Sequence, residues 1–279
     1  MKLFLALLTS FFLTISSSGQ PLQVEEELNS SYYELHGLEI NLTSDQISIN
    51  KANQDIYKEN ITGKKVFKTS PAENYFLIAN YRFSNQKVDY PVDIRVFSRE
   101  GLMDLPFKFL APFDLPHPII NVNDNGVLAL FDPLNFKVKL ISEESYNEIE
   151  LEKDIPFEME KASFIEINED FLFIPTSQSA LDITENASNA ALYKVNLNDL
   201  SIDKKIIDYN TPTMLKIIGG GVYVSGVKFE NLKPIGKTVK YDMMLNQLSS
   251  NDKIIEKLLL HGNKFYAKYF NVIYDLNSD

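Results

Sequence analysis

Short runs of alternating apolar and polar residues dominate the chain and predict β-strands. Tyr193, Val195 and Leu197 alternate with polar residues, and the same pattern recurs at 136–140 and 93–96. An alternation of period two, carried by β-branched and aromatic residues, is typical of a strand with one buried face. Stretches with helical period are scarce after the first 20 residues. The pattern therefore predicts an all-β fold.

A second pattern joins two apolar runs through a short turn rich in Gly, Asn and Asp, which are the residues that hairpin turns require. It occurs at 119–131, 164–174, 215–224 and 258–267, with a weaker copy at 66–78. The turn centres near Asp124, Glu169, Gly220 and Gly262 are spaced by 45, 51 and 42 residues. A further strand pair follows each hairpin. A repeat of this length predicts one four-stranded sheet per unit, with neighbouring sheets stacked around an axis.

With this repeat, residues 32–279 resemble the exported bacterial six-bladed β-propellers of the broad TolB/NHL-like type. The resemblance rests on periodicity, and no family signature motif accompanies it. We expect a single propeller domain at 20–279 with four-stranded blades, six in number; five blades or a pair of β-sandwiches are the alternatives. The chain reaches its end with one outer strand missing from the last blade. Residues 31–42 are expected to supply that strand and close the ring.

The first 19 residues have the order of a secretory signal peptide: a charged Lys2, an apolar run at 3–15 and small residues at 16–19. The apolar run is too short to span a bilayer, which takes about 20 residues. A buried core helix and a membrane anchor are the alternative interpretations. No later segment has 18 consecutive apolar residues, so we expect no transmembrane helix in the mature chain. The pattern predicts a secreted or periplasmic protein.

Composition narrows the possible functions. The 279 residues are 44% hydrophobic, which is enough for a sizeable core, and carry a formal net charge of -11. This acidic balance argues against nucleic-acid binding, which needs clustered Lys and Arg. The chain contains no cysteine, which excludes disulfides, thiolate metal sites and cysteine nucleophiles.

No motif assigns a catalytic residue. The zinc-protease and esterase motifs are absent, and Ser225, the nearest approach to a nucleophile elbow, is interpreted as the second strand of a blade. His36, His117 and His261 lie too far apart in sequence to form a local metal pair. His117, between two prolines, is a candidate base or metal ligand or else a structural loop histidine. The catalytic and metal-binding residues therefore stay unknown.

Three short motifs have alternative interpretations. The loop Asn121–Gly126 has oxygen side chains spaced somewhat like a calcium loop but lacks the distal glutamate, and it is interpreted as a hairpin turn. Gly236-Lys237-Thr238 looks like the end of a phosphate loop, but Asn231 occupies the position of the first glycine and no strand–loop–helix context follows. Gly219-Gly220-Gly221 has no helix after it and is interpreted as a turn.

Two segments are candidate binding surfaces. The stretch 143–160 is strongly acidic, with Lys153 and Lys161 as the nearest bases in the sequence. It is either a solvated loop with an edge strand or a docking surface for a basic partner. The polar segment 177–189 interrupts a blade and is the longest predicted excursion, and long loops on rigid scaffolds often bind ligands.

These observations favour a non-enzymatic exported propeller that binds or scaffolds a peptide, saccharide or protein through the loops of one face. The alternative is a calcium-dependent hydrolase or lactonase with acidic ligands at the propeller axis, for which Asp93, Asp132 and Asp182 are candidates. The hydrolase would need calcium as its cofactor, whereas the binding propeller needs no cofactor. A structural component of a surface complex is a third possibility. Fold alone assigns none of these functions.

Overall fold

The structure is a computed structural model, and it describes the chain from Ser30 to Asp275 with gaps. The residues outside the description are 1–29, 85–86, 106–118, 133–134, 152–159, 163, 179–189, 209–210, 231–232, 253–256, 262–263, 270–271 and 276–279. The proposed signal peptide at 1–19 therefore lies outside the described residues. The chain divides into two compact units, one of residues 23–254 and one of residues 1–22 with 255–279.

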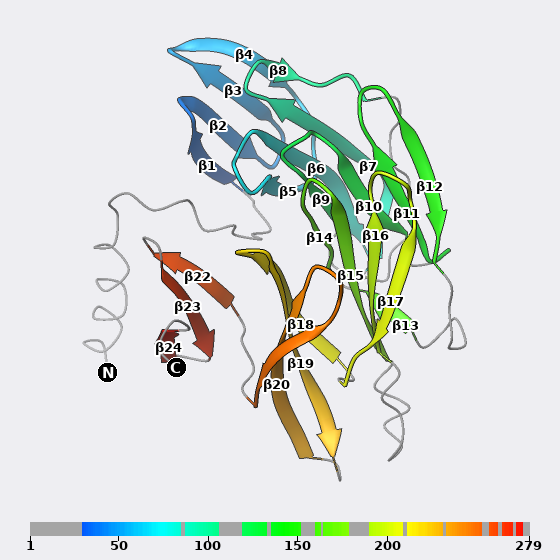
Figure 1. The fold of residues 1–279 in the computed structure, drawn as a ribbon. Helices are drawn as coiled ribbons and strands as arrows, with labels where there is room; N and C mark the ends of the chain where they lie inside the picture. Colours follow the sequence, from blue (N-terminus) through cyan, green and yellow to red (C-terminus); the bar gives the residue numbers. More distant parts are fainter. Residues whose placement is uncertain are drawn as a thin grey trace, which may run out of the picture. The chain divides into compact units, whose positions relative to one another are not determined.

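The larger unit contains five antiparallel sheets that follow one another along the chain (Figure 1). The first sheet consists of β1 (Ser30–Leu35), β2 (Leu38–Thr43), β3 (Ile47–Lys51) and β4 (Gln54–Glu59). The second consists of β5 (Lys64–Thr69), β6 (Tyr75–Ser84), β7 (Lys87–Ser98) and β8 (Gly101–Leu102). The third consists of β9 (Ile120–Val122), β10 (Leu128–Asp132), β11 (Lys137–Ile141) and β12 (Tyr146–Glu150). Each is a meander in which neighbouring strands are consecutive in sequence.

The fourth sheet has a divided first strand. Both β13 (Glu160–Ala162) and β14 (Glu166–Ile167) pair with β15 (Phe171–Gln178), which is followed by β16 (Ala191–Asn196) and β17 (Ile202–Ile206). The fifth sheet consists of β18 (Thr211–Ile218), β19 (Gly221–Glu230), β20 (Lys233–Asp242) and β21 (Gln247–Asn251). The smaller unit contains a three-stranded meander of β22 (Lys257–His261), β23 (Lys264–Tyr269) and β24 (Val272–Asp275).

A hydrophobic core fills each of the four interfaces between consecutive sheets of the larger unit. The first and second sheets share one that includes Ile40 and Phe76, and the second and third share one around Leu77 and Leu130. Tyr193 belongs to the core between the third and fourth sheets, and Val224 to the core between the fourth and fifth. A middle sheet therefore buries both faces, as a propeller blade does.

The first strands of successive sheets also lie beside one another. Strand β5 contacts β9, β9 contacts β14, and β14 contacts β18. This neighbour order is that of inner strands in adjacent blades. Together with the four-stranded meanders and the cores between them, it identifies the fold as a β-propeller of four-stranded blades, which confirms the predicted fold class.

All five predicted hairpins are present, each joining the first main strand of a sheet to the second. They are β5–β6, β9–β10, β14–β15, β18–β19 and β22–β23. The turn at Gly219 and Gly220 has positive φ at both residues, 54° and 72°. This is the geometry for which glycine was expected there.

Residues 31–42, expected to supply an outer strand to the last blade, form most of β1 and β2 in the described residues. These two strands pair with each other and belong to the first sheet. The turn between them explains this, because His36 (φ 49°) and Gly37 (φ 76°) both adopt the left-handed conformation of a tight hairpin. The short turn directs the chain back onto itself.

Two cationic side chains, the buried Lys65 and the partly buried Arg95, connect the first sheet to the second. The Lys65 ammonium is fully buried and donates to the carbonyls of Thr43 (2.7 Å), Ile61 (3.0 Å) and Gly63 (3.2 Å). Burial lowers the pKa of Lys65. Thr43 is the last residue of β2, and Ile61 and Gly63 lie in the connection between β4 and β5, so one side chain of β5 binds both places.

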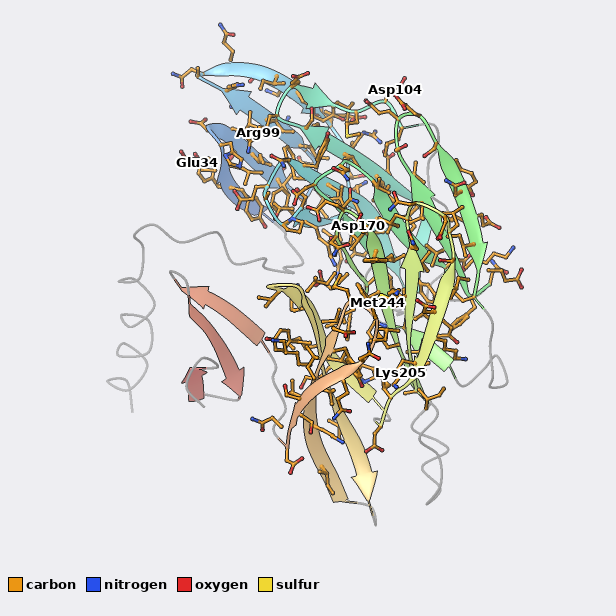
Figure 2. All side chains as sticks on the ribbon, viewed as in Figure 1. Glu34, Arg99, Asp104, Asp170, Lys205 and Met244 are labelled. Carbon is orange, nitrogen blue, oxygen red and sulfur yellow. The ribbon has the colours of Figure 1, made fainter. Side chains whose placement is uncertain are left out.

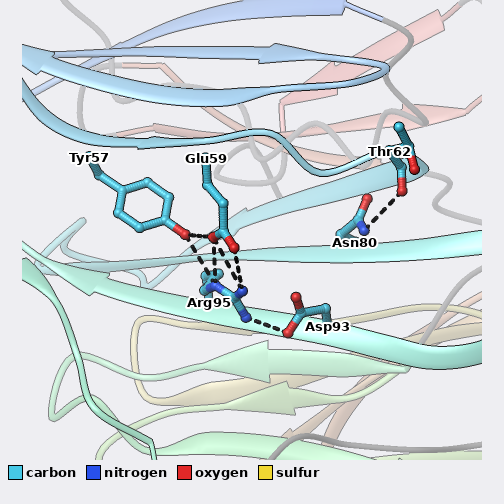
Figure 3. Close-up of polar contacts among 6 residues, drawn as sticks. All are labelled: Tyr57, Glu59, Thr62, Asn80, Asp93 and Arg95. Atoms are coloured by element: carbon cyan, nitrogen blue, oxygen red, sulfur yellow. Dashed lines mark hydrogen bonds and ion pairs between the residues drawn. The ribbon is translucent and has the colours of Figure 1, made fainter.

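The second of these cationic side chains is Arg95 on β7 (Figure 3). Its guanidinium donates to the Tyr57 hydroxyl and to the Glu59 carboxylate of β4, each at 3.2 Å, and forms an ion pair with Asp93. Burial acts to lower the pKa of Arg95, but the bonds to Asp93 and Tyr57 outweigh it and raise that pKa. Nearby, the Asn80 amide donates to the Thr62 carbonyl at 3.2 Å (Figure 3).

Candidate functional site

A cavity of about 590 Å³ opens among the turns of the second and third sheets. The turns that form it are β5–β6, β7–β8, β9–β10 and β11–β12. Its volume falls in the range of ligand pockets, about 300–1,000 Å³. The lining residues are Asn74, Tyr75, Ser98, Arg99, Glu100, Gly101, Leu102, Met103, Asp124 and Glu143. We call this cavity the turn pocket.

Hydrogen bonds between the two sheets hold the wall of the turn pocket in place. The Asp124 carboxylate, in the β9–β10 turn, accepts the amide proton of Ala72 at 3.0 Å and a hydrogen bond from the Ser70 hydroxyl. The same Ser70 oxygen accepts the amide proton of Tyr75 at 3.1 Å. One carboxylate therefore positions the β5–β6 turn against the neighbouring sheet.

The Asn121–Gly126 loop that carries Asp124 is a hairpin turn, as its sequence favoured. The side-chain oxygen of Asn123 accepts the amide protons of Asn125 (3.0 Å) and Val127 (2.8 Å). Gly126 has φ 76°, and a Cβ there would lie 2.9 Å from the ring of Tyr75. The Asn123 oxygen thus shapes the turn, and the absence of a side chain at Gly126 makes room for Tyr75.

An apolar floor and a mixed rim complete the turn pocket. Tyr75 and Met103 are partly buried and pack against the core that the second and third sheets share. Leu102 is 46% exposed at the rim. The β7–β8 hairpin supplies this side of the pocket, and the Ser98 hydroxyl accepts the Glu100 amide proton at 3.1 Å across its turn. Arg99 and Asp104, labelled in Figure 2, lie on either side of Gly101 and Met103 in the chain.

Acidic groups outnumber basic ones in this lining. Glu100, Asp124 and Glu143 carry carboxylates, whereas Arg99 is the single cation among the lining residues. The Arg99 guanidinium lies 3.3 Å from the His36 ring in the first sheet, and that ring lies 3.4 Å from the Glu73 carboxylate. Glu143 accepts only the Asp104 amide proton, at 3.4 Å, in the described part of the chain.

The side chains of the other two histidines lie outside the part of the chain that the structure describes. His117 lies outside the described residues. His261 ends β22 and pairs in register with Lys264, and its side chain is outside the description. His36, which the sequence did not single out for a role, is the one histidine whose side chain is described, and it contacts Arg99 of the turn pocket.

The two described carboxylates among the candidate calcium ligands each have another partner. Asp93 is paired with Arg95. Asp132 accepts the backbone and side-chain amide protons of Asn135, at 3.2 and 2.8 Å, within its own turn. Asp182 lies outside the described residues. Among the residues that the structure describes, no group of three or more His, Asp and Glu side chains could hold a metal ion.

The first strands carry a polar chain that the sequence analysis missed. Asn121 of β9 donates to the Ile165 carbonyl at 3.1 Å and to the Glu166 carboxylate of β14 at 3.4 Å. Glu166 also forms an ion pair with Lys216 of β18. This chain links three consecutive sheets, and its central carboxylate already has a cationic partner.

The acidic stretch at 143–160 divides into two parts. Lys137, on the adjacent strand β11, pairs with Glu148 at 2.9 Å and Glu150 at 3.9 Å, and Lys139 lies 3.6 Å from Glu148. The hydrogen bond from Lys137 lowers the pKa of Glu148. Cross-strand partners are invisible to a search for nearby bases in sequence. The turn residue Glu143, in contrast, lines the turn pocket.

The remaining motifs are structural. Lys237 and Thr238 lie within strand β20, where Lys237 is 3.4 Å from Asp208 and Thr238 donates to the Ser225 hydroxyl at 2.8 Å. Ser225 is fully buried in β19, the second strand of its sheet, as predicted. Of the segment 177–189, only Ser177 and Gln178, at the end of β15, lie in the described residues.

Among known proteins, this chain is similar only to solved structures of low sequence identity. No protein-family model matches the chain, and no curated protein matches it. Similar solved structures include a eukaryotic initiation factor (12% identity over 88% of this chain and 71% of that one, TM-score 0.48). A protein of unknown function from Desulfotomaculum acetoxidans has 9% identity over 89% and 82%, TM-score 0.48. Apo AztD from Citrobacter koseri has 13% identity over 89% and 68%, TM-score 0.47.

All three TM-scores lie below 0.5, so the fold assignment rests on the sheets and the cores between them. Within the described residues, the structure has no helix long and apolar enough to cross a membrane.

Proposed function

We propose that this protein is an exported, non-enzymatic β-propeller that binds or scaffolds a partner, and that the turn pocket is its binding site. One observation carries the proposal: a cavity of about 590 Å³ lies between two consecutive blades, and hydrogen bonds between those blades fix its wall. Preorganised walls favour binding because less conformational entropy is lost when a ligand is held.

The chemistry of the turn pocket supports binding rather than catalysis. A general base needs a nucleophile or substrate proton within reach, and among the described residues the lining holds neither a histidine nor a paired nucleophile and base. Its one serine, Ser98, accepts the Glu100 amide proton and belongs to a hairpin turn. Carboxylates beside an apolar floor of an aromatic ring and a thioether are the elements of a recognition surface.

Export is part of the proposal and rests on the N-terminal sequence. The charged, apolar and small-residue segments of residues 1–19 have the order that secretion requires. The absence of cysteine fits an oxidising compartment. N-terminal sequencing of the protein recovered from the medium or periplasm tests it: a start near Gln20 supports export, and an intact Met1 in the cytoplasm contradicts it.

The calcium-dependent hydrolase remains the alternative, but no observation favours it. Its two described candidate ligands, Asp93 and Asp132, are engaged with Arg95 and Asn135. Turnover of lactone or ester substrates that requires calcium would move this alternative ahead.

The binding proposal is tested with a pocket-filling variant. Asn74→Trp places a large side chain in the lining, and no hydrogen bond of the Asn74 side chain appears in the described structure. Asn198→Trp, in the exposed β16–β17 turn of the fourth sheet, is the matched control. A panel of short peptides and oligosaccharides is titrated into the three proteins by calorimetry, with thermal unfolding to verify folding.

The expected result is at least one ligand that binds the wild type and the Asn198→Trp protein but not the Asn74→Trp protein. If every ligand that binds does so equally in all three folded proteins, the binding site is elsewhere. If no ligand in the panel binds, the pocket is not a site for these classes and the proposal fails.

A further inference from the structure

Resting on the proposed function, we infer that the turn pocket is specific for an organic cation on an apolar stem, such as the side chain of a lysine residue or a free alkyl diamine. The lining carries more carboxylates than cations, its one cation contacts a neighbouring sheet, and its floor is apolar.

The excess of carboxylates in the lining favours a cationic ligand. Three carboxylates, those of Glu100, Asp124 and Glu143, line the cavity with one guanidinium. Glu100 and Glu143 are both exposed, and neither has an ion-pair partner in the described part of the chain. An anion entering the pocket would meet repulsion from each carboxylate, about 1 kcal/mol at 4 Å even in water, and a cation would meet the same attraction.

The single cation of the lining is engaged outside the pocket. Arg99 contacts the His36 ring at 3.3 Å, in the β1–β2 turn of the first sheet, and none of its contacts in the described structure is to a carboxylate of the pocket. Arg99 therefore does not neutralise Glu100 or Glu143 as Lys137 neutralises Glu148 on the outer strands of the third sheet.

The apolar floor is an independent argument, because it selects a stem as well as a charge. Tyr75 and Met103 line the cavity while packing on the core beneath it. An aromatic ring attracts an ammonium group over its face, and a thioether adapts to an alkyl chain. Leu102, 46% exposed, extends this apolar surface to the rim. A lysine-type ligand can bury its methylene groups here and place its ammonium among the carboxylates.

The test uses four probes on the full chain. They are a capped Gly-Lys-Gly peptide, the same peptide with norleucine in place of lysine, cadaverine, and a neutral oligosaccharide. Calorimetric titrations at low salt measure each affinity. The lysine peptide is expected to bind about tenfold or more tightly than the norleucine peptide, and its affinity is expected to fall as salt screens the carboxylates.

Matched substitutions assign the effect to the pocket. Glu100→Gln and Glu143→Gln are each expected to weaken binding of the lysine peptide about three- to tenfold. Glu144→Gln is the control, because Glu144 follows Glu143 in the same exposed turn but does not line the cavity. All three remove one negative charge, so a general effect of net charge would appear equally in the control. Thermal unfolding verifies that each variant is folded.

The outcomes separate the two claims. Cadaverine binding as tightly as the lysine peptide supports a free amine as the ligand, and tighter peptide binding supports a side chain; both support the cation class. Equal affinity for the lysine and norleucine peptides, or unchanged binding in the Glu100→Gln/Glu143→Gln double variant, overturns the inference. If the oligosaccharide alone binds, and Asn74→Trp abolishes that binding, the proposed function stands and the cation class is wrong. If no probe is sensitive to Asn74→Trp, both fail.

Discussion

The Asp124 carboxylate accepts the backbone amide proton of Ala72 at 3.0 Å, which joins a turn of the third sheet to a turn of the second. The two residues are 52 positions apart in the chain. Because Asn74 and Tyr75 lie two and three residues after Ala72, this contact determines where one wall of the turn pocket lies. A hairpin turn in one blade thus supports a binding surface in the next.

Replacing Asp124 with alanine should therefore destabilise the protein and loosen the pocket. The variant loses hydrogen bonds from Ser70 and Ala72, which costs about 1–3 kcal/mol. Asp170→Ala is the control, because Asp170 occupies the corresponding turn of the fourth sheet (labelled in Figure 2) and its carboxylate has no such bond in the described residues. Urea unfolding at pH 7 should show a change below about 0.5 kcal/mol for Asp170→Ala. Equal effects would refute the role given to Asp124.

The buried Lys65 should be among the most sensitive cationic positions. Lys65→Met keeps most of the stem but leaves the carbonyls of Thr43, Ile61 and Gly63 without their donor, which should cost about 2–4 kcal/mol. Lys51→Met, at the exposed end of β3, should change the free energy of unfolding by less than about 0.5 kcal/mol. Urea unfolding measures both. A Lys65→Met protein as stable as the wild type would show that water replaces the ammonium.

Tyr241 makes stability depend on pH above 10. Burial, with a smaller effect of Asp208, raises the pKa of Tyr241 to about 12. The unfolded chain releases this proton near pH 10, so between pH 10 and 12 the folded state holds more protons than the unfolded state. The contribution of Tyr241 is present below pH 10 and is lost as pH rises towards 12, by at most about 1.4 kcal/mol per pH unit.

Tyr241→Phe should remove that part of the slope while keeping the ring in the core between the fourth and fifth sheets. Urea unfolding of both proteins from pH 8 to 11.5 measures the difference between their slopes. Other titrating groups contribute alike to both and cancel. Parallel curves for the two proteins would contradict the assignment.

Calcium should not alter stability if the protein is a binding propeller without a metal site. A ligand that binds only the folded state adds about 4 kcal/mol at a thousandfold excess over its Kd, which would raise the unfolding temperature by several degrees. We expect the midpoints in calcium and in excess chelator to agree within about 1 °C. A large loss of stability in chelator would favour the hydrolase and call for a screen of lactones and esters.

The strands and hairpins were predictable because their causes are local. Alternation at Tyr193 and Val195 and the glycines at 219–221 act through neighbours in sequence, and β16 and the β18–β19 turn lie where they predict. Lys194 shows the limit. The alternating pattern around Lys194 indicated an exposed side chain, but Lys194 is only 4% exposed. Its ammonium lies 2.6 Å from the Asp203 carboxylate and over the ring of Phe171. A blade between two neighbours buries both faces, so period-two patterns understate burial.

The candidate site could not be predicted in the same way. Its wall depends on Asp124 reaching Ala72, and its lining combines turns that are separated by up to about 70 residues. Glu143 belonged to the predicted acidic surface. Lys137, on the adjacent strand, pairs with Glu148 of that surface and not with Glu143. The sequence alone does not show which carboxylate receives this partner. Long-range pairing of turns and strands leaves no contiguous motif.

The central claim, that the turn pocket is the binding site, is tested most directly by thiol protection. The chain has no cysteine, so Asn74→Cys and Asn198→Cys each introduce a single reactive thiol. Maleimide labelling rates are measured with and without saturating capped Gly-Lys-Gly peptide. We predict that the peptide slows labelling at position 74 several-fold and leaves position 198 unchanged. Equal rates at position 74 with and without bound peptide would contradict the account.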